Sequence, residues 1–301
     1  MKYRPGEWAG YAVYGAVSTG LFFLPRPAVL ALGRGLGRLA YRISPRHRRI
    51  ALGNLETAFG REKTARERAA IARASFAHFG QVTLETIKFA HFSRARVLEL
   101  IDIEGREHLE RALAGGKGVL AFSAHYGNWE TMIPALSPMG PFHVIARQLD
   151  NRLVDRRLAA VRTRMGGVII DKMGAARPIT RVLKRGGIIA ILVDQNVLRS
   201  EAVFVDFFGR PAATTPGLAS FHILTGAPLL PVFCRPQGRR HVWTILPPPE
   251  ISLSGRREED VLKITRICTK MIEDQIRRAP EWWLWMHKRW NTRPAGEKNP
   301  R

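Results

Sequence analysis

The stretch GVLAFSAHYGNWE, residues 118–130, runs from an unbroken apolar segment directly into a histidine, an asparagine and a glutamate. Its first five residues, 118–122, are continuously apolar rather than alternating, which is typical of a strand buried on both faces of a parallel sheet. Helices cover both faces of such sheets, and ligands bind beyond the carboxyl ends of their strands. This stretch therefore predicts an α/β fold and makes His125 a candidate site residue.

The rest of the chain alternates short apolar runs with longer segments of helical period. We expect further strands at residues 142–147, 167–170, 188–193, 229–234 and 241–246, and helices at residues 63–92, 151–165, 175–185, 215–225 and 258–278. The predicted architecture is a mixed, largely parallel sheet covered by helices, forming one catalytic domain over residues 46–301. In one such sheet, Arg147 and Asp194 would lie at the same edge as His125.

The composition narrows the class of partner. Among 301 residues, 48 Lys and Arg against 25 Asp and Glu give a formal net charge of +23, so the partners should be anionic. Nucleic acid, a phosphate-bearing membrane face, and an acidic protein or phosphorylated substrate are all compatible with that charge. The chain lacks the simplest motifs of serine hydrolases, zincins and P-loop enzymes, and its two cysteines suggest neither a disulfide framework nor a zinc site.

The N-terminal segment predicts membrane association. Residues 8–24, WAGYAVYGAVSTGLFFL, carry no charge, are marginally long enough to span a bilayer, and are followed by a series of arginines that could reach anionic headgroups. We therefore expect residues 1–45 to form a membrane-anchor helix with a basic juxtamembrane segment, and the body to be cytoplasmic. A signal peptide and a buried soluble helix are the alternatives. The glycines of GRGLG, residues 33–37, lack the Rossmann spacing and predict close helix packing.

The residues after the first strand permit acid–base chemistry. Gly127 gives a permissive backbone, Asn128 is a good N-cap, and Glu130 would fall in the first helical turn, where its carboxylate could reach the ring of His125. A histidine held by a carboxylate through one ring nitrogen can act as a base through the other. The alternative is a capped turn without catalysis, in a basic protein that binds membranes or nucleic acid.

Several segments resemble one known family. HYGNWE resembles the His-x-x-x-x-Glu box of the lipid A biosynthesis lauroyl/myristoyl acyltransferases, a branch of the lysophospholipid acyltransferase superfamily. The same resemblance, in the family's order, extends to NLETAFG (54–60), VDQN (193–196), VFVDFFGRPAATTPGLA (203–219), APLLPVF (227–233) and APEWWLWMHKRWNTRP (279–294). The resemblance covers essentially the whole chain. It departs from some close members at Asn196, where they carry an acidic residue, so other glycolipid acceptors stay open.

The resemblance implies an inner-membrane O-acyltransferase of lipid A and lipopolysaccharide biosynthesis, with its catalytic domain on the cytoplasmic face. His125 would be the base on the acceptor hydroxyl and Glu130 its carboxylate partner. The candidate substrate-binding residues are Gly127, Asn128, Arg147, Asp194, Gln195 and Arg210. The donor would be an acyl thioester on acyl carrier protein or coenzyme A, and the acceptor a phosphorylated glycolipid such as a lipid A precursor. We expect no metal, no other cofactor and no nucleic-acid partner. A lysophospholipid or other glycolipid acyltransferase that uses acyl-CoA is the alternative enzyme.

Overall fold

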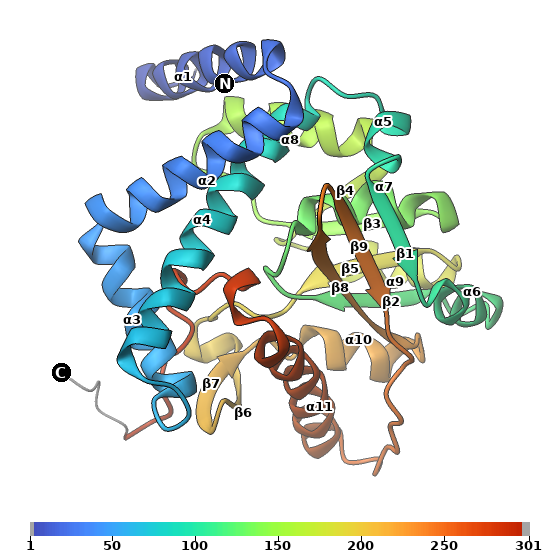
Figure 1. The fold of residues 1–301 in the computed structure, drawn as a ribbon. Helices are drawn as coiled ribbons and strands as arrows, with labels where there is room; N and C mark the ends of the chain where they lie inside the picture. Colours follow the sequence, from blue (N-terminus) through green and yellow to red (C-terminus); the bar gives the residue numbers. More distant parts are fainter. Residues whose placement is uncertain (1–2, 297–301) are drawn as a thin grey trace.

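A central mixed sheet organises the chain in the computed structural model, which describes residues 3–296 (Figure 1). The strand order is β1-β9-β8-β2-β5-β3-β4. Strands β8, β2, β5, β3 and β4 run parallel, β9 is antiparallel to β8, and β1 is parallel to β9. The strands are β1 Ile101–Glu104, β2 Val119–Ser123, β3 Phe142–Ala146, β4 Gly167–Asp171, β5 Ile188–Leu192, β8 Leu229–Gln237 and β9 Arg240–Ile245. The predicted mixed, largely parallel sheet is confirmed.

Helices cover both faces of this sheet, because each central strand is apolar on both sides. All five residues of β2 are buried: Leu120 and Phe122 contribute to one core, and Val119 and Ala121 to the other. The first core includes α3 Pro45–Phe59, α4 Ala65–Phe89, α9 Ala176–Lys184, α10 Gly217–Thr225 and α11 Arg257–Arg278. The second includes α5 Arg94–Leu98, α6 Arg106–Ala114, α7 Met132–Leu136 and α8 Arg152–Arg164.

The N-terminal region folds as separate helices that pack on α4. Helix α1 covers Pro5–Phe23 and α2 covers Arg26–Ile43, with Pro25 at the junction, where its missing N–H and the clash of its ring with the preceding turn disfavour one continuous helix. The predicted glycine packing is confirmed, because a Cβ atom on Gly37 would lie 2.0 Å from the carbonyl oxygen of Phe76. No helix within residues 3–296 combines the length and the apolar character required to cross a membrane.

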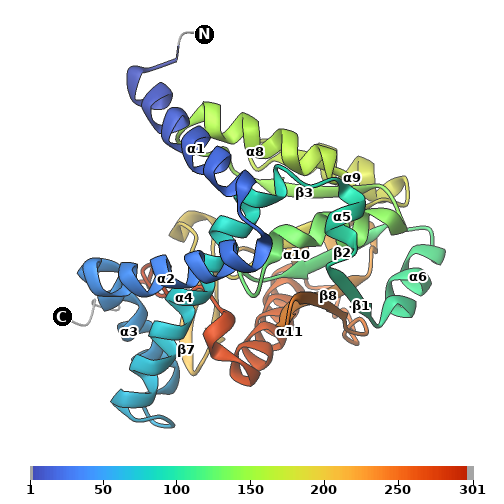
Figure 2. The same cartoon turned by 45° about the horizontal axis from the view of Figure 1, so that its top comes forward.

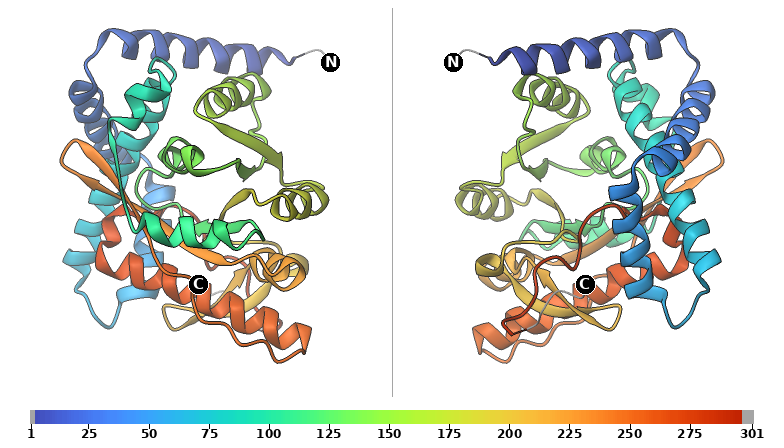
Figure 3. Two further views of the ribbon diagram at one scale, coloured as in Figure 1. Left: turned by 90° about the vertical axis from the view of Figure 1, so that its right-hand side faces the viewer. Right: turned by 90° about the vertical axis from the view of Figure 1, so that its left-hand side faces the viewer.

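Helix α1 is fixed near its two ends and runs alongside α8 (Figures 2 and 3). Near its start, Glu7 accepts hydrogen bonds from the Arg152 side chain at the start of α8, at 2.8 Å. Near its end, the Leu21 carbonyl accepts a hydrogen bond from Lys88 of α4 at 2.9 Å. Between these contacts, Val13 and Val17 are exposed. Helix α1 is therefore tied to both α4 and α8.

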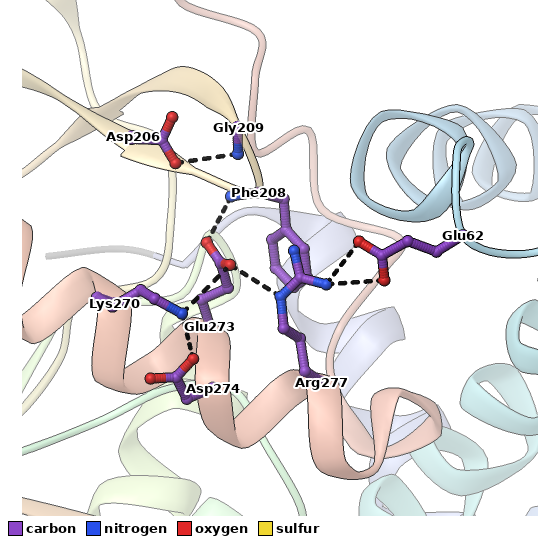
Figure 4. A network of polar contacts seen from close by, with 8 residues as sticks. All are labelled: Glu62, Asp206, Phe208, Gly209, Lys270, Glu273, Asp274 and Arg277. Carbon is purple, nitrogen blue, oxygen red and sulfur yellow. Dashed lines mark hydrogen bonds and ion pairs between the residues drawn. The ribbon is translucent and has the colours of Figure 1, made fainter.

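The hairpin of β6 Val203–Phe207 and β7 Arg210–Thr214 was not expected from the sequence. Figure 4 shows how α11 holds its turn. Glu273 accepts the backbone N–H of Phe208 at 2.6 Å, and Phe208 adopts a left-handed φ of 55°. Arg277 packs over the Phe208 ring and donates to Glu273 and to Glu62. The anchored turn fixes the direction of the hairpin, whose far end lies beside the site described below.

Candidate active site

The candidate site forms where two neighbouring parallel strands end. Ser123 of β2 lies opposite Leu192 of β5, and the chain continues two residues beyond each to His125 and Asp194. The His125 Nδ1 lies 2.8 Å from one Asp194 carboxylate oxygen, while the backbone N–H of His125 donates to the other oxygen at 2.9 Å. The predicted convergence of His125 and Asp194 at one edge of the sheet is confirmed.

The Asp194 carboxylate is held in its charged form. Burial alone would raise its pKa, but the positive charge of the His125 ring in its protonated form, its ring hydrogen bond, the His125 backbone N–H and the Trp283 indole outweigh that effect and lower the pKa to about 2. The indole Nε1–H of Trp283 donates to the carboxylate at 2.8 Å. A carboxylate of this kind keeps the proton of the neutral imidazole on Nδ1 and leaves the Nε2 lone pair as a base.

The second ring nitrogen of His125 has a partner of its own. The side-chain amide nitrogen of Gln195 lies 3.2 Å from Nε2. The side chain of His125 is 18% exposed, so this end of the dyad is the part that a substrate could reach. Trp129 packs edge-on against the imidazole, with ring centroids 5.1 Å apart, and limits its rotation.

The expected pairing of Glu130 with His125 is wrong. Both oxygens of Glu130 accept hydrogen bonds from Arg162 of α8, at 2.6 and 3.0 Å. The chain enters a 3₁₀ turn over Trp129–Thr131 instead of the regular helix that the sequence suggested, so that Trp129 lies against His125 and Glu130 bonds to α8. The largely buried Arg162 guanidinium requires a carboxylate, and Glu130 provides it.

Asn128 occupies the expected N-cap position, before the 3₁₀ turn, but its side chain does not cap that turn. Asn128 makes no side-chain capping bond; its buried Nδ2 donates to Glu85 of α4 at 2.7 Å. Glu85 also lies 2.6 Å from Arg26 Nε of α2 and 3.0 Å from His241 Nε2 of β9. Burial would raise the pKa of Glu85, yet His241, Arg26 and Asn128 lower it to about 2. The side chain of Asn128 thus belongs to a buried charged network and does not bond to the turn that follows it.

Gly127 adopts the permissive backbone expected of it. Its φ is +60°, and a Cβ atom at this position would lie 2.2 Å from the carbonyl oxygen of Cys234. Its N–H donates to the carbonyl of Trp282 at 3.0 Å. No other residue type fits this left-handed turn so close to β8. Gly127 therefore sets the path of the chain between His125 and Asn128.

The structure does not bring Arg147 and Arg210 to the dyad. Arg147 follows β3 at the correct edge, but its side chain is 81% exposed and lies 3.7 Å from Asp150. Arg210 begins β7 at the turn of the hairpin, four residues and about 13 Å along the strand from Thr214. Both arginines are exposed, and no contact ties either side chain to His125 or Asp194 within residues 3–296.

Sequence reasoning missed the C-terminal residues that support the site. Arg289 is buried and donates to the carbonyl of Ala213 and the hydroxyl of Thr214, both at 2.6 Å, and to the carbonyl of Gln195 at 3.5 Å. His287 accepts the backbone N–H of Asn196 at 3.0 Å. Their signal was a run of polar residues inside the tryptophan-rich segment 279–294, and that pattern alone does not identify the segment they contact.

Comparisons with known proteins match nearly the whole chain. A family described as bacterial lipid A biosynthesis acyltransferase matches residues 3–292. A lipid A biosynthesis lauroyltransferase of Escherichia coli K12 is 29% identical, covering 91% of this chain and 88% of that protein. A lipid A biosynthesis palmitoleoyltransferase of the same strain is 29% identical, covering 92% of this chain and 89% of that protein. A phosphatidylinositol mannoside acyltransferase of Mycolicibacterium smegmatis is 28% identical, covering 77% of this chain and 76% of that protein.

Proposed function

Because the chain belongs to the bacterial lipid A biosynthesis acyltransferase family and is therefore an O-acyltransferase, we propose that it moves a fatty acyl group from an acyl thioester to a hydroxyl of a phosphorylated glycolipid. The observation that carries this proposal is the His125–Asp194 dyad, with Nδ1 held at 2.8 Å and the Nε2 end partly exposed. No metal or further cofactor enters the proposed reaction.

The dyad supports direct transfer between two substrates. The acceptor hydroxyl attacks the thioester carbonyl carbon while its proton moves to Nε2 of His125. Asp194 stabilises the imidazolium that forms, because it is buried, charged and already bonded to Nδ1. The tetrahedral intermediate then collapses, the carbon–sulfur bond breaks, and the leaving thiolate takes the proton from Nε2. An ester and a free thiol are the products.

The acceptor that we propose first is a lipid A precursor. Two of the relatives are lipid A biosynthesis enzymes, whereas a third acts on a phosphatidylinositol mannoside, so the shared acceptor chemistry is a phosphorylated glycolipid. Asn196, where the chain departs from the family pattern, bonds through its side chain to Thr292, with the amide nitrogen and the amide oxygen each at 3.0 Å. Its side chain is thus occupied by a contact within the protein. The departure therefore gives no reason to prefer another acceptor.

The experiment measures transfer of labelled acyl groups by the purified protein in mixed micelles. The donors are acyl carrier protein and coenzyme A thioesters, and the acceptors are a tetra-acylated lipid A precursor, a phosphatidylinositol mannoside and a lysophospholipid. We expect transfer from acyl carrier protein to the lipid A precursor, and its loss in His125→Ala. Folded protein that transfers to none of these acceptors, and binds any polyanion equally well with or without His125, would instead be the basic binding protein.

We also propose that the protein works at the cytoplasmic face of the inner membrane. Leu32, Leu36, Leu39 and Ile43 are exposed on α2 and spaced so that they share one side of the helix. Exposed arginines at 34, 38 and 42 follow a second side of the helix, roughly 90–170° around its axis from the apolar stripe. A helix that exposes both apolar and cationic side chains can contact acyl chains and anionic headgroups at a membrane interface. The stripe supports contact with the membrane along the length of α2.

A further inference from the structure

The nitrogen that must accept the proton is already occupied. With the Nδ1 proton directed at Asp194, Nε2 of His125 carries a lone pair, and the amide N–H of Gln195 donates to it over 3.2 Å. This distance is at the long end for a hydrogen bond, so the contact is weak. An acceptor hydroxyl can reach Nε2 only by displacing the amide.

The backbone next to Gln195 is held from the C-terminal segment, chiefly through Asn196. The buried Arg289 adds only a long contact of 3.5 Å to the carbonyl of Gln195. The next residue, Asn196, is bonded through its backbone N–H to His287 and through its side chain to Thr292. The main chain at residues 195–196 therefore cannot shift without breaking several contacts.

The Gln195 side chain is held much less. Within residues 3–296, the Gln195 amide makes one hydrogen bond, the contact to His125. Gln195 is only partly buried. Rotation about its side-chain bonds would free Nε2 and leave the dyad, the backbone and the C-terminal segment in place. A pinned backbone with a weakly held side chain is the arrangement expected of a rotamer gate.

We propose that Gln195 guards the base against water until an acceptor hydroxyl displaces it. The inference rests on the proposed acyl transfer. Without the guard, water would give its proton to Nε2, add to the thioester carbonyl and expel the thiol, releasing a free fatty acid. A single water gains little by displacing the amide. A glycolipid can do so because its other groups contribute binding energy that is used at the reacting centre.

The test compares hydrolysis with transfer in Gln195→Ala and Gln195→Asn. Both variants remove the contact, the first by deleting the amide and the second by shortening the side chain by one methylene. The matched control is Gln237→Ala, an exposed glutamine at the end of β8. The readouts are release of free fatty acid from acyl thioester without acceptor, and the ratio of fatty acid to acylated glycolipid with acceptor present.

We expect acceptor-free hydrolysis to rise about fivefold in both variants, the effect of losing one neutral hydrogen bond, and to stay at the wild-type level in Gln237→Ala. The gain should vanish in the double variant His125→Ala/Gln195→Ala. A purely structural role for Gln195 would lower both rates together and leave their ratio unchanged. Hydrolysis that does not rise in either folded variant overturns the guard. Wild-type protein that transfers to no acceptor overturns the proposed function instead.

Discussion

At the residue scale, Asp194 combines three donors on one buried carboxylate: the His125 ring, the His125 backbone and the Trp283 indole. We predict that Asp194→Asn lowers kcat about 10²- to 10⁴-fold, because the amide can hold the imidazole in the wrong tautomer and cannot stabilise its positive charge. The His125→Ala/Asp194→Asn double variant should be no slower than His125→Ala alone, because the two residues act as a unit. Losses that multiply would contradict the dyad. Steady-state kinetics on folded protein decide between these results.

Glu130 should behave differently, because its partner is Arg162 and not the base. Glu130→Gln leaves a largely buried guanidinium without a carboxylate, so we predict a loss of about 2–3 kcal/mol in the free energy of unfolding. The kcat of the folded fraction should stay within about threefold of wild type. Adding Arg162→Gln should recover part of the stability. Denaturant unfolding measures the first effect, and a collapse of kcat at unchanged stability would restore Glu130 as the catalytic partner.

The two carboxylates show what sequence can and cannot predict about this site. The sequence predicted that His125 and Asp194 meet, because each follows an apolar run and parallel strands end at a common edge of the sheet. Which carboxylate reaches the ring depended on the turn after Gly127, and a 3₁₀ turn cannot be told from a first helical turn by spacing alone. Long-range partners such as Trp283 and Arg289 come from a segment about 90 residues away from Asp194, and no local pattern specifies such contacts.

At the element scale, long helices and buried strands could be predicted because their apolar pattern is set by the layers that they separate. Helix α8, expected over residues 151–165, covers Arg152–Arg164, and strand β3, expected over residues 142–147, covers Phe142–Ala146. The hairpin β6–β7 was missed, since its turn at Phe208–Gly209 takes its geometry from Glu273 of α11 (Figure 4). Gly209 suits its left-handed φ of 74°, but Phe208 does not, so the turn also depends on the tertiary contact to Glu273.

The apolar stripe on α2 gives the first element-scale prediction. Leu36→Asp places a charge in the middle of the stripe, so we predict weaker binding to vesicles that contain anionic phospholipid, by about tenfold. The side chain is 46% exposed, so the melting temperature should hardly change. The matched control is Leu253→Asp, 51% exposed in the loop before α11. Sedimentation with vesicles measures both, and equal losses in the two variants would remove α2 as the contact surface.

The buried Glu85–His241 pair joins α4 to β9 and should make stability depend on pH. Burial lowers the pKa of His241, but the Glu85 charge and the Cys234 contact outweigh it and raise the pKa from 6.5 to about 10. Because the pKa of His241 is raised on folding, its charged interaction contributes fully to the free energy of unfolding below pH 6.5. This contribution is lost as the pH rises towards 10. For Glu85, whose pKa is lowered from 4.5 to about 2, the contribution is complete above pH 4.5 and is lost towards pH 2.

We therefore predict that His241→Gln is destabilised most between pH 4.5 and 6.5, on the order of a few kcal/mol, and that this difference shrinks by pH 9.5. Denaturant unfolding of wild type and variant at each pH gives the difference directly. The exposed His47→Gln on α3 is the control for a surface histidine. A constant difference from pH 5 to 9.5 would mean that His241 is not charged in the folded protein.

At the scale of the whole molecule, segments that are far apart in sequence converge behind the dyad. Asn54 of α3 donates to the carbonyls of Trp285 and His287, at 2.8 and 2.6 Å, and His287 in turn holds Asn196 beside Gln195. These contacts join three of the segments that resemble the family, residues 54–60, 193–196 and 279–294. The segments that resemble the family therefore contain residues that support the site as well as residues proposed to react.

The net charge of +23 acts at the same scale and gives the last prediction. A broad positive potential speeds the approach of an anionic donor, and salt screens that potential, with a Debye length of about 10 Å at 0.1 M. For donor bound to acidic acyl carrier protein, we predict that kcat/KM falls about tenfold between roughly 0.05 and 0.5 M NaCl in neutral micelles, while kcat changes little. An uncharged acyl thioester, with the same acceptor, should change less than about threefold. Equal salt dependence for both donors would place the charge effect on the acceptor or the membrane, and would argue against an acidic carrier protein as the natural donor.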